Sequence, residues 1–323
     1  MRGLKMLEQP ILGVVMDPIQ KIHPEKDTTL ALLLAAQKRG FKLHYLELPD
    51  LFLQYGNPWG LSRILDLDPS QEPYYHLSEP ILGPLDQFDV LLMRKDPPVD
   101  MQYLYATYIL EHAEQNGCLV LNKPKALRDA NEKLFATWFP QCMPPTLVSA
   151  SRTILKTFIE EQGVVVLKPL DGMGGRNIFQ IAMGDPNLNS MIESLTHQET
   201  NYIMAQRYIP EITAGDKRIL LINGEPIPFG LARIPAADDF RGNLAAGGTG
   251  IGVELSKRDL WICAQIGPTL REKGLTFVGI DVIGDYLTEI NVTSPTCVRE
   301  LETIFDIDIA DKVIAAIMDR LED

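Results

Sequence analysis

Near its C-terminal end the chain contains a stretch, Phe277 to Thr296, that reads as two apolar β-strands joined by a turn at Gly284. Two carboxylates and one amide, Asp281, Glu289 and Asn291, stand among the apolar residues of these strands. Carboxylates in a half-buried sheet are costly unless a cation meets them. Glu289 and Asn291 are two residues apart, so on one strand they face the same side. A fold that buries this face of the hairpin must therefore bring positive charge to it.

These side chains offer only hard oxygen ligands, which suit Mg²⁺ and not zinc. We expect a Mg²⁺ site here, with Mn²⁺ left open as a substitute, and Mg²⁺ held in this way usually also holds nucleotide phosphates. A strict two-residue turn would pair Asp281 with Thr288 and point Asp281 away from Glu289. Their convergence predicts an odd number of connecting residues, as in a three-residue loop with a bulge. A surface hairpin with solvated acids is the alternative.

Composition narrows the class of protein. The chain has 323 residues, is 46% hydrophobic and carries a net charge of −13. That charge argues against nucleic acid or an anionic membrane as partner. No apolar run approaches the roughly 20 residues that span a membrane, and the N-terminus has no signal-peptide core. The four cysteines are scattered, which favours a reducing cytoplasm.

The first 125 or so residues alternate between strand and helix, which predicts an open, parallel α/β sheet. In such sheets ligands bind at the carboxyl ends of strands, where Asp17, Arg94, Lys95 and Asn122 fall, although these residues could equally well only end the strands. The stretch from Gln54 to Gln87 is rich in Pro, Gly and polar residues and is interpreted as irregular connection. The expected elements are strands 10–16, 41–47, 89–95 and 118–122, and helices 27–39 and 101–116.

The pattern changes near Leu127 to short strands with tight turns, which indicates an α+β half with antiparallel sheets. Asn223-Gly224 is a hairpin turn signal. A helix is expected over 256–273 with an interruption near Gly267, and another over 308–321. The expected strands are 164–169, 177–182, 202–207, 217–222 and 227–232.

A second constellation begins with Lys168, which ends a strand and is followed by Gly172, Gly174, Gly175 and Arg176. Glycines let backbone N–H groups approach phosphate oxygens, and the lysine adds a point charge. The order is not that of a Walker A loop, where Lys follows the glycines. We interpret the segment as a flap over a nucleotide, with an ordinary β-turn as the alternative.

Two arginines, Arg218 and Arg233, carry forked donors suited to carboxylates or phosphates. The stretch from 234 to 253 is dense in Gly and Ala and contains Arg241. Loops of that length are usually lids or disordered, and we interpret this one as a mobile cover. Cys297 has no histidine nearby in sequence and is interpreted as a buried structural thiol.

These elements in this order resemble the ATP-grasp superfamily. The similarity is closer at several strings, and together they resemble the bacterial glutathione synthetase family over nearly the whole chain from about Ile11. The strings are 93–98 (MRKDPP), 131–133 (NEK), 167–175 (LKPLDGMGG), 215–218 (GDKR), 241–248 (RGNLAAGG) and 287–297 (LTEINVTSPTC).

The resemblance implies an N-terminal α/β domain over 1–127 and a two-lobed ATP-grasp module. Its lid lobe would span 128–207, and its catalytic lobe 208–323 with the mobile loop 234–253. It implies a cytoplasmic homotetramer. The implied reaction joins γ-glutamylcysteine and glycine: ATP phosphorylates the cysteinyl carboxylate, and glycine attacks the acyl phosphate, which gives glutathione, ADP and phosphate.

The resemblance also implies residue roles. ATP would be bound by Lys133, Lys168, Gly172, Gly174, Gly175, Gln206, Arg207, Tyr208, Ile209 and Asp216. The metal would be held by Asp281, Glu289 and Asn291. The peptide substrate would contact Arg94, Arg218, Arg233, Asn291, Ser294 and Glu300. Catalysis would fall to Arg218 and Arg241.

Other interpretations stay open at this point. A different ATP-grasp ligase would share the ATP site, since a fold does not determine a substrate. A silent nucleotide-binding regulator would be favoured by loss of a metal ligand or of Lys168, but these residues are present. A nicotinamide oxidoreductase is disfavoured because no GxGxxG follows the first strand. Four segments depart from the family pattern, namely 1–5, 176–177, 236–240 and 249–253.

Overall fold

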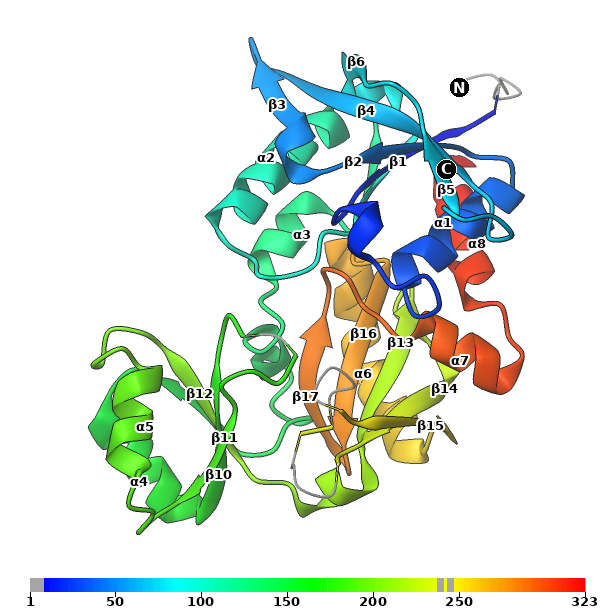
Figure 1. The fold of residues 1–323 in the computed structure, drawn as a ribbon. Coiled ribbons are helices and arrows are strands. Elements are labelled where there is room, and N and C mark those ends of the chain that lie inside the picture. Colours follow the sequence, from blue (N-terminus) through cyan, green and yellow to red (C-terminus); the bar gives the residue numbers. More distant parts are fainter. Residues whose placement is uncertain (1–8, 173, 237–240, 243–246, 323) are drawn as a thin grey trace.

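The computed structural model describes residues 9–172, 174–236, 241–242 and 247–322. The departures expected at 1–5 and 237–240 lie outside the described residues. Within the described chain, three sheets organise the molecule, and the element order confirms a mixed α/β and α+β architecture (Figure 1).

The first sheet has eight strands in the described chain, with β3-β4-β2-β1-β7-β8 as its main order. Strands β2, β1, β7 and β8 are parallel, as expected, and the others are antiparallel additions. Its strands are β1 (Ile11–Val15), β2 (Lys42–Leu46), β3 (Leu51–Gln54), β4 (Asn57–Leu67), β5 (Tyr75–Leu77), β6 (Ile81–Pro84), β7 (Val90–Met93) and β8 (Leu119–Leu121). Its helices are α1 (Thr28–Lys38), α2 (Met101–Gln115) and α3 (Pro124–Asp129).

The prediction that Gln54 to Gln87 is irregular was wrong. The stretch contains β4, which pairs with β2, β3, β5 and β6. Gly60, one of the glycines of this stretch, is required for packing: a Cβ there would lie 2.6 Å from Leu85 Cδ2. Glycine inside a strand often marks such a close approach.

The second sheet forms a separate lobe, called the central lobe here. Its antiparallel order is β11-β10-β12-β9, and two helices pack on it. Its elements are β9 (Thr146–Ser149), α4 (Arg152–Gln162), β10 (Val164–Pro169), β11 (Phe179–Ala182), α5 (Leu188–Leu195) and β12 (Ile203–Arg207). One hydrophobic cluster, drawn only from this lobe among the described residues, forms its core. In Figure 1 the lobe stands apart from the rest of the molecule.

The third sheet, called the catalytic sheet below, is antiparallel with the order β15-β14-β13-β16-β17. Its elements are β13 (Asp216–Ile222), β14 (Glu225–Ile234), β15 (Thr249–Glu254), α6 (Lys257–Lys273), β16 (Phe277–Ile283), β17 (Tyr286–Asn291), α7 (Val298–Phe305) and α8 (Ile309–Glu322). The expected loop 234–253 is therefore too long, because 249–253 pairs with β14. The expected interruption of the 256–273 helix is also wrong, since α6 runs through Pro268.

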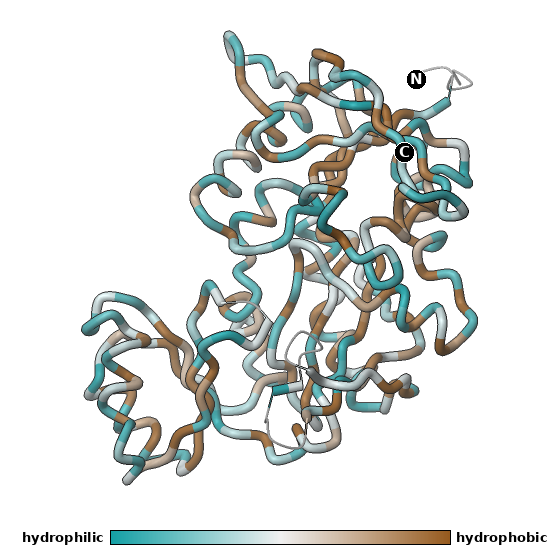
Figure 2. The backbone as a smooth tube through the Cα atoms, in the orientation of Figure 1, coloured by the Kyte–Doolittle hydropathy of each residue, from teal (hydrophilic) through white to brown (hydrophobic). Residues whose placement is uncertain are grey.

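Two continuous cores join the first sheet to the catalytic sheet. Each combines residues of both regions, such as Val15 with Ile280 in one and Val14 with Leu231 in the other. The brown segments of Figure 2 gather along the inner strands of both regions. Helix α8 returns to pack on α1, where Arg39 and Asp311 form a two-pronged ion pair of 2.5 and 2.7 Å. No described helix has both the length and the apolar character needed to cross a membrane.

Candidate functional site

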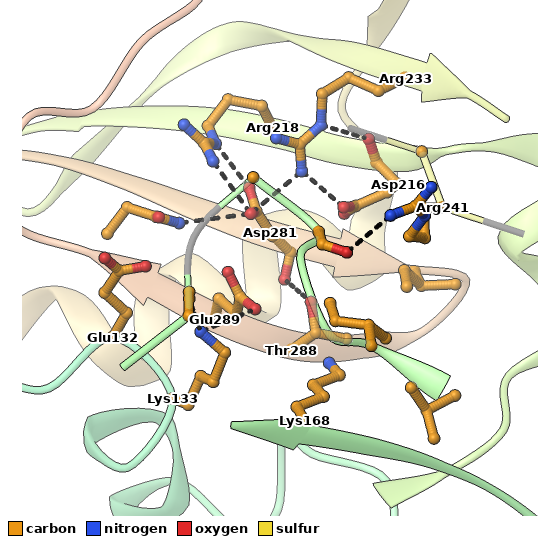
Figure 3. A pocket seen from close by; sticks show the side chains of 18 of the residues that line it. Glu132, Lys133, Lys168, Asp216, Arg218, Arg233, Arg241, Asp281, Thr288 and Glu289 are labelled. Carbon is orange, nitrogen blue, oxygen red and sulfur yellow. Dashed lines mark hydrogen bonds and ion pairs between the residues drawn. The ribbon is translucent and has the colours of Figure 1, made fainter. Parts of the chain in front are cut away.

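A cleft of about 290 Å³ lies between the central lobe and the catalytic sheet. Both regions supply its walls, and Figure 3 shows the charged side chains that point into it. The structure brings together here these residues selected from the sequence: Lys133, Lys168, Gly172, Gly174, Gly175, Gln206, Arg207, Tyr208, Ile209, Asp216, Arg218, Arg233, Arg241, Asp281, Glu289, Asn291 and Ser294. It does not place Arg94 or Glu300 in this cleft.

The β16–β17 hairpin places its acids on one face, as expected. Asp281 is directly opposite Glu289, and Gly279 is opposite Asn291. The register shifts between Asp281 and Val282, so the predicted bulge is present. The predicted three-residue loop is wrong: Ile283 pairs with Tyr286, which leaves two residues in the turn. The bulge supplies the extra residue that makes the two carboxylates converge.

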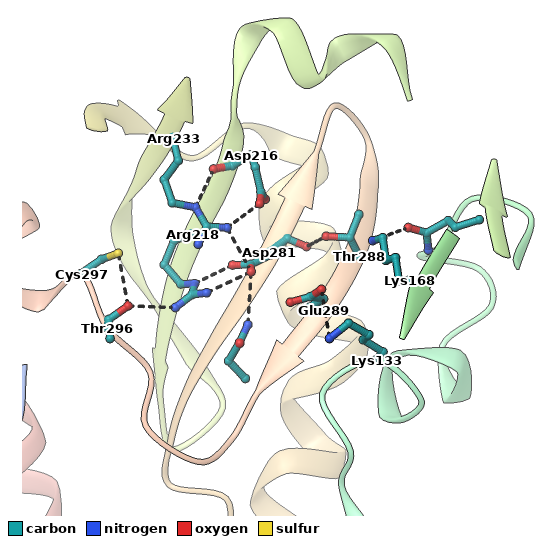
Figure 4. Close-up of polar contacts among 12 residues, drawn as sticks. Lys133, Lys168, Asp216, Arg218, Arg233, Asp281, Thr288, Glu289, Thr296 and Cys297 are labelled. Atoms are coloured by element: carbon teal, nitrogen blue, oxygen red, sulfur yellow. Dashed lines mark hydrogen bonds and ion pairs between the residues drawn. The ribbon is translucent and has the colours of Figure 1, made fainter. Parts of the chain in front are cut away.

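Asp281 is the centre of a buried network of charges (Figure 4). Arg218 grips it with two N–H groups at 2.5 and 3.0 Å, and Arg233 approaches at 3.0 Å. Arg233 also bridges to Asp216 at 2.6 Å. Burial alone would raise the pKa of Asp281, but the two guanidinium groups outweigh it and hold that pKa well below its usual range. Asp281 is therefore ionised throughout the physiological range.

Asp216 has the opposite titration behaviour. Burial raises its pKa to about 6, although Arg233 works against that rise. Its Oδ1 atom is buried without a protein partner among the described residues. A free acceptor inside a cleft is available to a ligand hydroxyl group.

A second cluster sits where the chain enters the central lobe. The Lys133 ammonium lies 3.7 Å from Glu289 and donates to the Gly172 carbonyl at 2.7 Å. Glu132 lines the same part of the cleft, and burial, reinforced by Glu289, raises its pKa to about 7. Sequence reasoning missed Glu132, although its place beside Lys133 was a usable signal. After this segment a 3-10 turn begins at Phe135.

The glycine flap follows Lys168 between the antiparallel strands β10 and β11, as expected. Gly174 and Gly175 adopt positive φ angles of 63° and 77°, which glycine reaches at no steric cost. Arg241, from beyond β14, donates to the Gly175 carbonyl at 2.9 Å. Lys168 itself is buried, which lowers its pKa. Met173, inside the flap, lies outside the described residues.

One wall of the cleft is apolar, which the sequence reading did not predict. Its side chains come from both lobes, and they are Val166, Ile178, Ile209, Ile212 and Ile283. An apolar slot beside a few polar groups is typical of sites that bind a flat aromatic ring. These residues come from five separate elements or connections, so no local pattern could reveal the slot.

The hairpin donors fit a hard divalent cation. Asp281 and Glu289 offer carboxylate oxygens and Asn291 an amide oxygen, which are the ligands that Mg²⁺ and Mn²⁺ take. The described residues include no cluster of three or more His, Cys, Asp or Glu arranged as a metal cage. Two carboxylates with one amide fit a metal that completes its shell with water and phosphate oxygens. Arg218 and Lys133 meet these carboxylates here.

A second cavity, of about 390 Å³, continues the cleft toward the first sheet. The two share Asp96, Ser294 and Thr296 as lining residues. Arg94 lines this second cavity, where its buried guanidinium donates to Thr29 Oγ1 at 3.1 Å and to the Pro295 carbonyl at 3.0 Å. Burial lowers the pKa of Arg94.

Glu300 and Cys297 complete the comparison with expectation. Glu300 has one buried carboxylate oxygen without a protein partner in the described chain. Cys297 is buried, as expected, and burial raises its thiol pKa, which opposes a role as nucleophile. Its position in the cleft wall was not expected.

The sequence matches two family descriptions that together span almost the whole chain. Residues 11–128 match "Prokaryotic glutathione synthetase, N-terminal domain", and residues 132–306 match "Prokaryotic glutathione synthetase, ATP-grasp domain". The chain is 58% identical over 306 residues to glutathione synthetase of Coxiella burnetii, which covers 94% of this chain and 95% of that protein. It is 56% identical over 311 residues to glutathione synthetase of Pseudomonas syringae, covering 96% and 98%.

Solved structures share the fold at much lower identity. The D-cycloserine synthetase DcsG superposes with a TM-score of 0.68 at 13% identity, over 96% of this chain and 99% of that one. The ATP-grasp ligase PsnB, complexed with a precursor peptide and AMPPNP, superposes with a TM-score of 0.63 at 15% identity, over 98% and 100%. These likenesses support the ATP-grasp architecture alone.

Proposed function

The chain belongs to the prokaryotic glutathione synthetase family, and we propose that the cleft between its central lobe and catalytic sheet is the active site. The protein is an ATP-dependent ligase that joins γ-glutamylcysteine and glycine to form glutathione. The observation that carries the site assignment is the convergence of Lys133, Lys168, Arg218 and Arg233 on a wall of carboxylates. Such an arrangement of cations suits a reaction between anions.

The reaction requires that the charges of its anionic substrates be neutralised and that water be excluded from the active site. A carboxylate is a poor electrophile, so phosphorylation by ATP gives it a leaving group, and the glycine amine then displaces phosphate. Both ATP and the peptide carboxylate are anionic, so cations must surround the point of transfer. An acyl phosphate hydrolyses easily, and a cleft that excludes water protects it. The glycine flap, tied to Arg241 through the Gly175 carbonyl, is placed to provide that cover.

ATP would lie along the cleft between the two lobes. The adenine ring would occupy the apolar slot, beside the backbone of 206–209. The free Oδ1 of Asp216 would accept from a ribose hydroxyl group. Lys133 and Lys168 would contact the phosphates, with Gly172, Gly174 and Gly175 above them. This placement is supported by the apolar, neutral and cationic groups that line the same cleft.

A divalent metal belongs to this chemistry, and we propose Mg²⁺, with Mn²⁺ as a substitute. Asp281, Glu289 and Asn291 would hold it, and when bound it supplies charge that neutralises phosphate oxygens. Because Arg218 is held by Asp281, its guanidinium is oriented beside the same point and would stabilise the acyl phosphate. Asn291 already contacts Asp281 at 3.3 Å.

The peptide substrate would extend from the cleft into the second cavity. Arg233 and Ser294 line the cleft, and Ser294 and Arg94 line the second cavity. Glu300 is among the lining residues of neither cavity, and its assignment to the peptide substrate rests on the family resemblance. Arg241 would act from the cover. The limits 1–127, 128–207 and 208–323 remain our proposal for the three domains.

The decisive test is phosphate release from Mg·ATP with γ-glutamylcysteine and glycine, each alone and then together. We expect fast release with both, matched by glutathione formation. Release only with other amino acids or dipeptides would keep the ligase chemistry and move the substrate assignment. Arg218→Lys tests the site, and Lys125→Ala is its control, since that side chain is exposed on α3 and pairs only with Asp129 at 2.9 Å among described residues.

Two further parts of the proposal concern the protein in the cell. We place it in the cytoplasm, supported by four buried cysteines that are all free. We also propose a homo-oligomer, a tetramer by family resemblance, supported by exposed apolar side chains such as Tyr55 at 96%, Leu82 at 60% and Tyr105 at 51%. Light scattering coupled to size exclusion measures the mass directly.

A further inference from the structure

Gln206 makes contacts that point away from the role expected for it. The resemblance implied that Gln206 binds ATP, in a segment whose backbone would lie beside the adenine ring. In the structure its Oε1 accepts from the Lys168 ammonium at 3.1 Å, and its Nε2 donates to Thr146 Oγ1 at 3.1 Å. The dashed line from Lys168 in Figure 4 marks the first of these bonds. Gln206 is 2% exposed, so its amide must satisfy its hydrogen bonds inside the protein or on a ligand.

The strand register makes this contact a feature of the sheet. Gln206 on β12 is directly opposite Val166 on β10 and Thr146 on β9. Lys168 is two residues beyond Val166, so it lies on the same face, diagonal to Gln206. Diagonal neighbours on one face are within reach of long side chains. The three polar side chains therefore form a row across the face that looks into the cleft.

The row also determines which way the Gln206 amide points. The Thr146 hydroxyl has one proton, and it donates this proton to the Pro144 carbonyl at 2.8 Å. Toward Gln206 it can then only accept, so the NH₂ end of the amide must face Thr146. The carbonyl end is left to face Lys168. Amide orientation is normally assigned from such networks, and here the network leaves a single assignment.

We propose that Gln206 and Thr146 are positioning residues that hold the Lys168 ammonium in place for the nucleotide phosphates. The proposal rests on the assignment of Lys168 to the phosphates made above. A lysine side chain is flexible and strongly hydrated, and burial removes its water. The Gln206 oxygen replaces one water molecule on the Lys168 ammonium and restricts the rotamers of the lysine side chain. Less conformational entropy of Lys168 is therefore lost when ATP binds. Thr146 acts at one remove, since it is not among the described residues that line the cleft.

The two roles of Gln206 predict different losses. If it reads adenine, its removal weakens every ligand that carries the base. If it positions Lys168, its removal weakens ATP and spares adenosine, which has no phosphate. Calorimetric titration of the full-length protein with Mg·ATP and with adenosine separates the two. We expect Gln206→Leu to lower ATP affinity about tenfold to thirtyfold and to leave adenosine affinity unchanged.

Variants of Thr146 discriminate better between the two roles, because Thr146 does not line the cleft and so cannot contact the adenine base. Thr146→Val removes the acceptor and frees the amide to turn its NH₂ group toward the ammonium, so we expect ATP affinity to fall about threefold to tenfold. Thr146→Ser keeps the hydroxyl and should restore the affinity to within about twofold. The KM for ATP should rise in the same order, while the KM for glycine stays at the wild-type value. Thermal melting reports whether each variant is folded.

The outcomes separate this proposal from the one on which it rests. Parallel loss of ATP and adenosine affinity in Gln206→Leu overturns the positioning role in favour of base reading. Equal losses in Thr146→Val and Thr146→Ser overturn it in favour of packing. Lys168→Met provides the reference. If it weakens ATP binding while Thr146→Val does not, only the positioning pair fails; if Lys168→Met binds ATP normally, the phosphate assignment fails as well.

Discussion

The N-terminal domain and the central lobe are attached to the catalytic sheet in opposite ways. The N-terminal domain shares two hydrophobic cores with it, whereas the β9–β12 sheet of the central lobe has a core of its own and contacts the catalytic sheet through hydrogen bonds such as that between Arg207 and Tyr286. Apolar cores separate only at a large cost, because burial of apolar surface drives folding. Hydrogen bonds at a cleft exchange readily with water or ligand. The N-terminal domain should therefore behave as a fixed wall and the central lobe as a movable cover.

Asn122 shows how the fixed attachment is made. It follows β8 at the end of the N-terminal sheet, and its amide donates to the carbonyls of Phe277 and Val292 at 2.8 and 2.7 Å. Its oxygen accepts from the N–H groups of Thr276 and Phe277 at 2.8 and 3.1 Å. One buried side chain thus satisfies four backbone groups of the catalytic sheet.

The central lobe is attached to the catalytic sheet by fewer buried contacts. Arg207, at the end of β12, donates to the Tyr286 hydroxyl at 3.0 Å, and Lys133 and Arg241 reach the carbonyls of Gly172 and Gly175. The flap carbonyls accept from side chains that we assign to ATP binding (Lys133) and to catalysis (Arg241). Closure of the lobe should therefore also position these side chains.

The largest expected effect comes from the fixed attachment. Asn122→Ala leaves four buried backbone groups without partners, and we expect it to lower the free energy of unfolding by about 4 kcal/mol. The measurement is urea denaturation, followed by fluorescence. Asn57→Ala is the matched control, because Asn57 is exposed and bonds only weakly to the Tyr55 carbonyl, at 3.4 Å. A loss below about 1 kcal/mol for Asn122→Ala would remove the distinction between the two attachments.

Arg218→Lys separates chemistry from closure. Lysine keeps the charge and loses the two-pronged grip on Asp281, so we expect kcat to fall by about a hundredfold. Arg218 lies on β13, in the fixed part, and ATP affinity should stay within about threefold of wild type. Steady-state kinetics and calorimetric titration give the two numbers. A large loss of ATP affinity with normal kcat would show that Arg218 serves binding instead.

The pH dependence of stability at Glu132 tests the connection between the fixed part of the molecule and the central lobe. Its pKa is raised from 4.5 to about 7 in the folded protein. The stability associated with its neutral form is present below pH 4.5 and is lost as the pH rises through 7. Glu132→Gln stays neutral, so it should gain about 2 kcal/mol relative to wild type between pH 5 and pH 8, measured by metal-free urea denaturation. An advantage that does not change with pH would contradict the assignment.

The smallest effect belongs to the movable attachment. Tyr286→Phe removes the hydroxyl that receives the Arg207 bond and keeps the ring, and we expect a change in unfolding free energy of about 0.5 kcal/mol. The KM for ATP should rise by about threefold, because the cover loses one of its contacts. A loss of stability as large as that of Asn122→Ala would show that the central lobe is also part of the fixed body.

Much of this arrangement could be predicted from the sequence, and the predictions that were wrong have physical reasons. Carboxylates among apolar residues predicted the hairpin, and the need for Asp281 and Glu289 to converge predicted its bulge. The strand over 249–254 was missed because its glycines suggested mobility. They serve packing instead: a Cβ at Gly252 would lie 2.5 Å from Ile304 Cγ2. Contacts across about fifty residues of sequence carry no local signal.

The roles of side chains could likewise be predicted where the signal was local in sequence and not where it depended on tertiary contacts. Lys168 could be selected from the sequence because it is a charged residue at the end of an apolar strand. Glu132 was missed because a charged residue next to another charged residue is typical of a solvent-exposed segment. The orientation of the Gln206 amide depends on Thr146, which is sixty residues earlier in the chain. Only the paired strands of the central lobe bring the two together.

Hydrogen exchange with and without Mg²⁺ and a non-hydrolysable ATP analogue tests the central claim most directly. The account predicts that added nucleotide protects the amides of β10, β12 and the glycine flap, while those of β1, β2, β7 and β8 exchange at unchanged rates. Equal changes in both sets of strands, or protection confined to the N-terminal sheet, would contradict a movable central lobe on a fixed base.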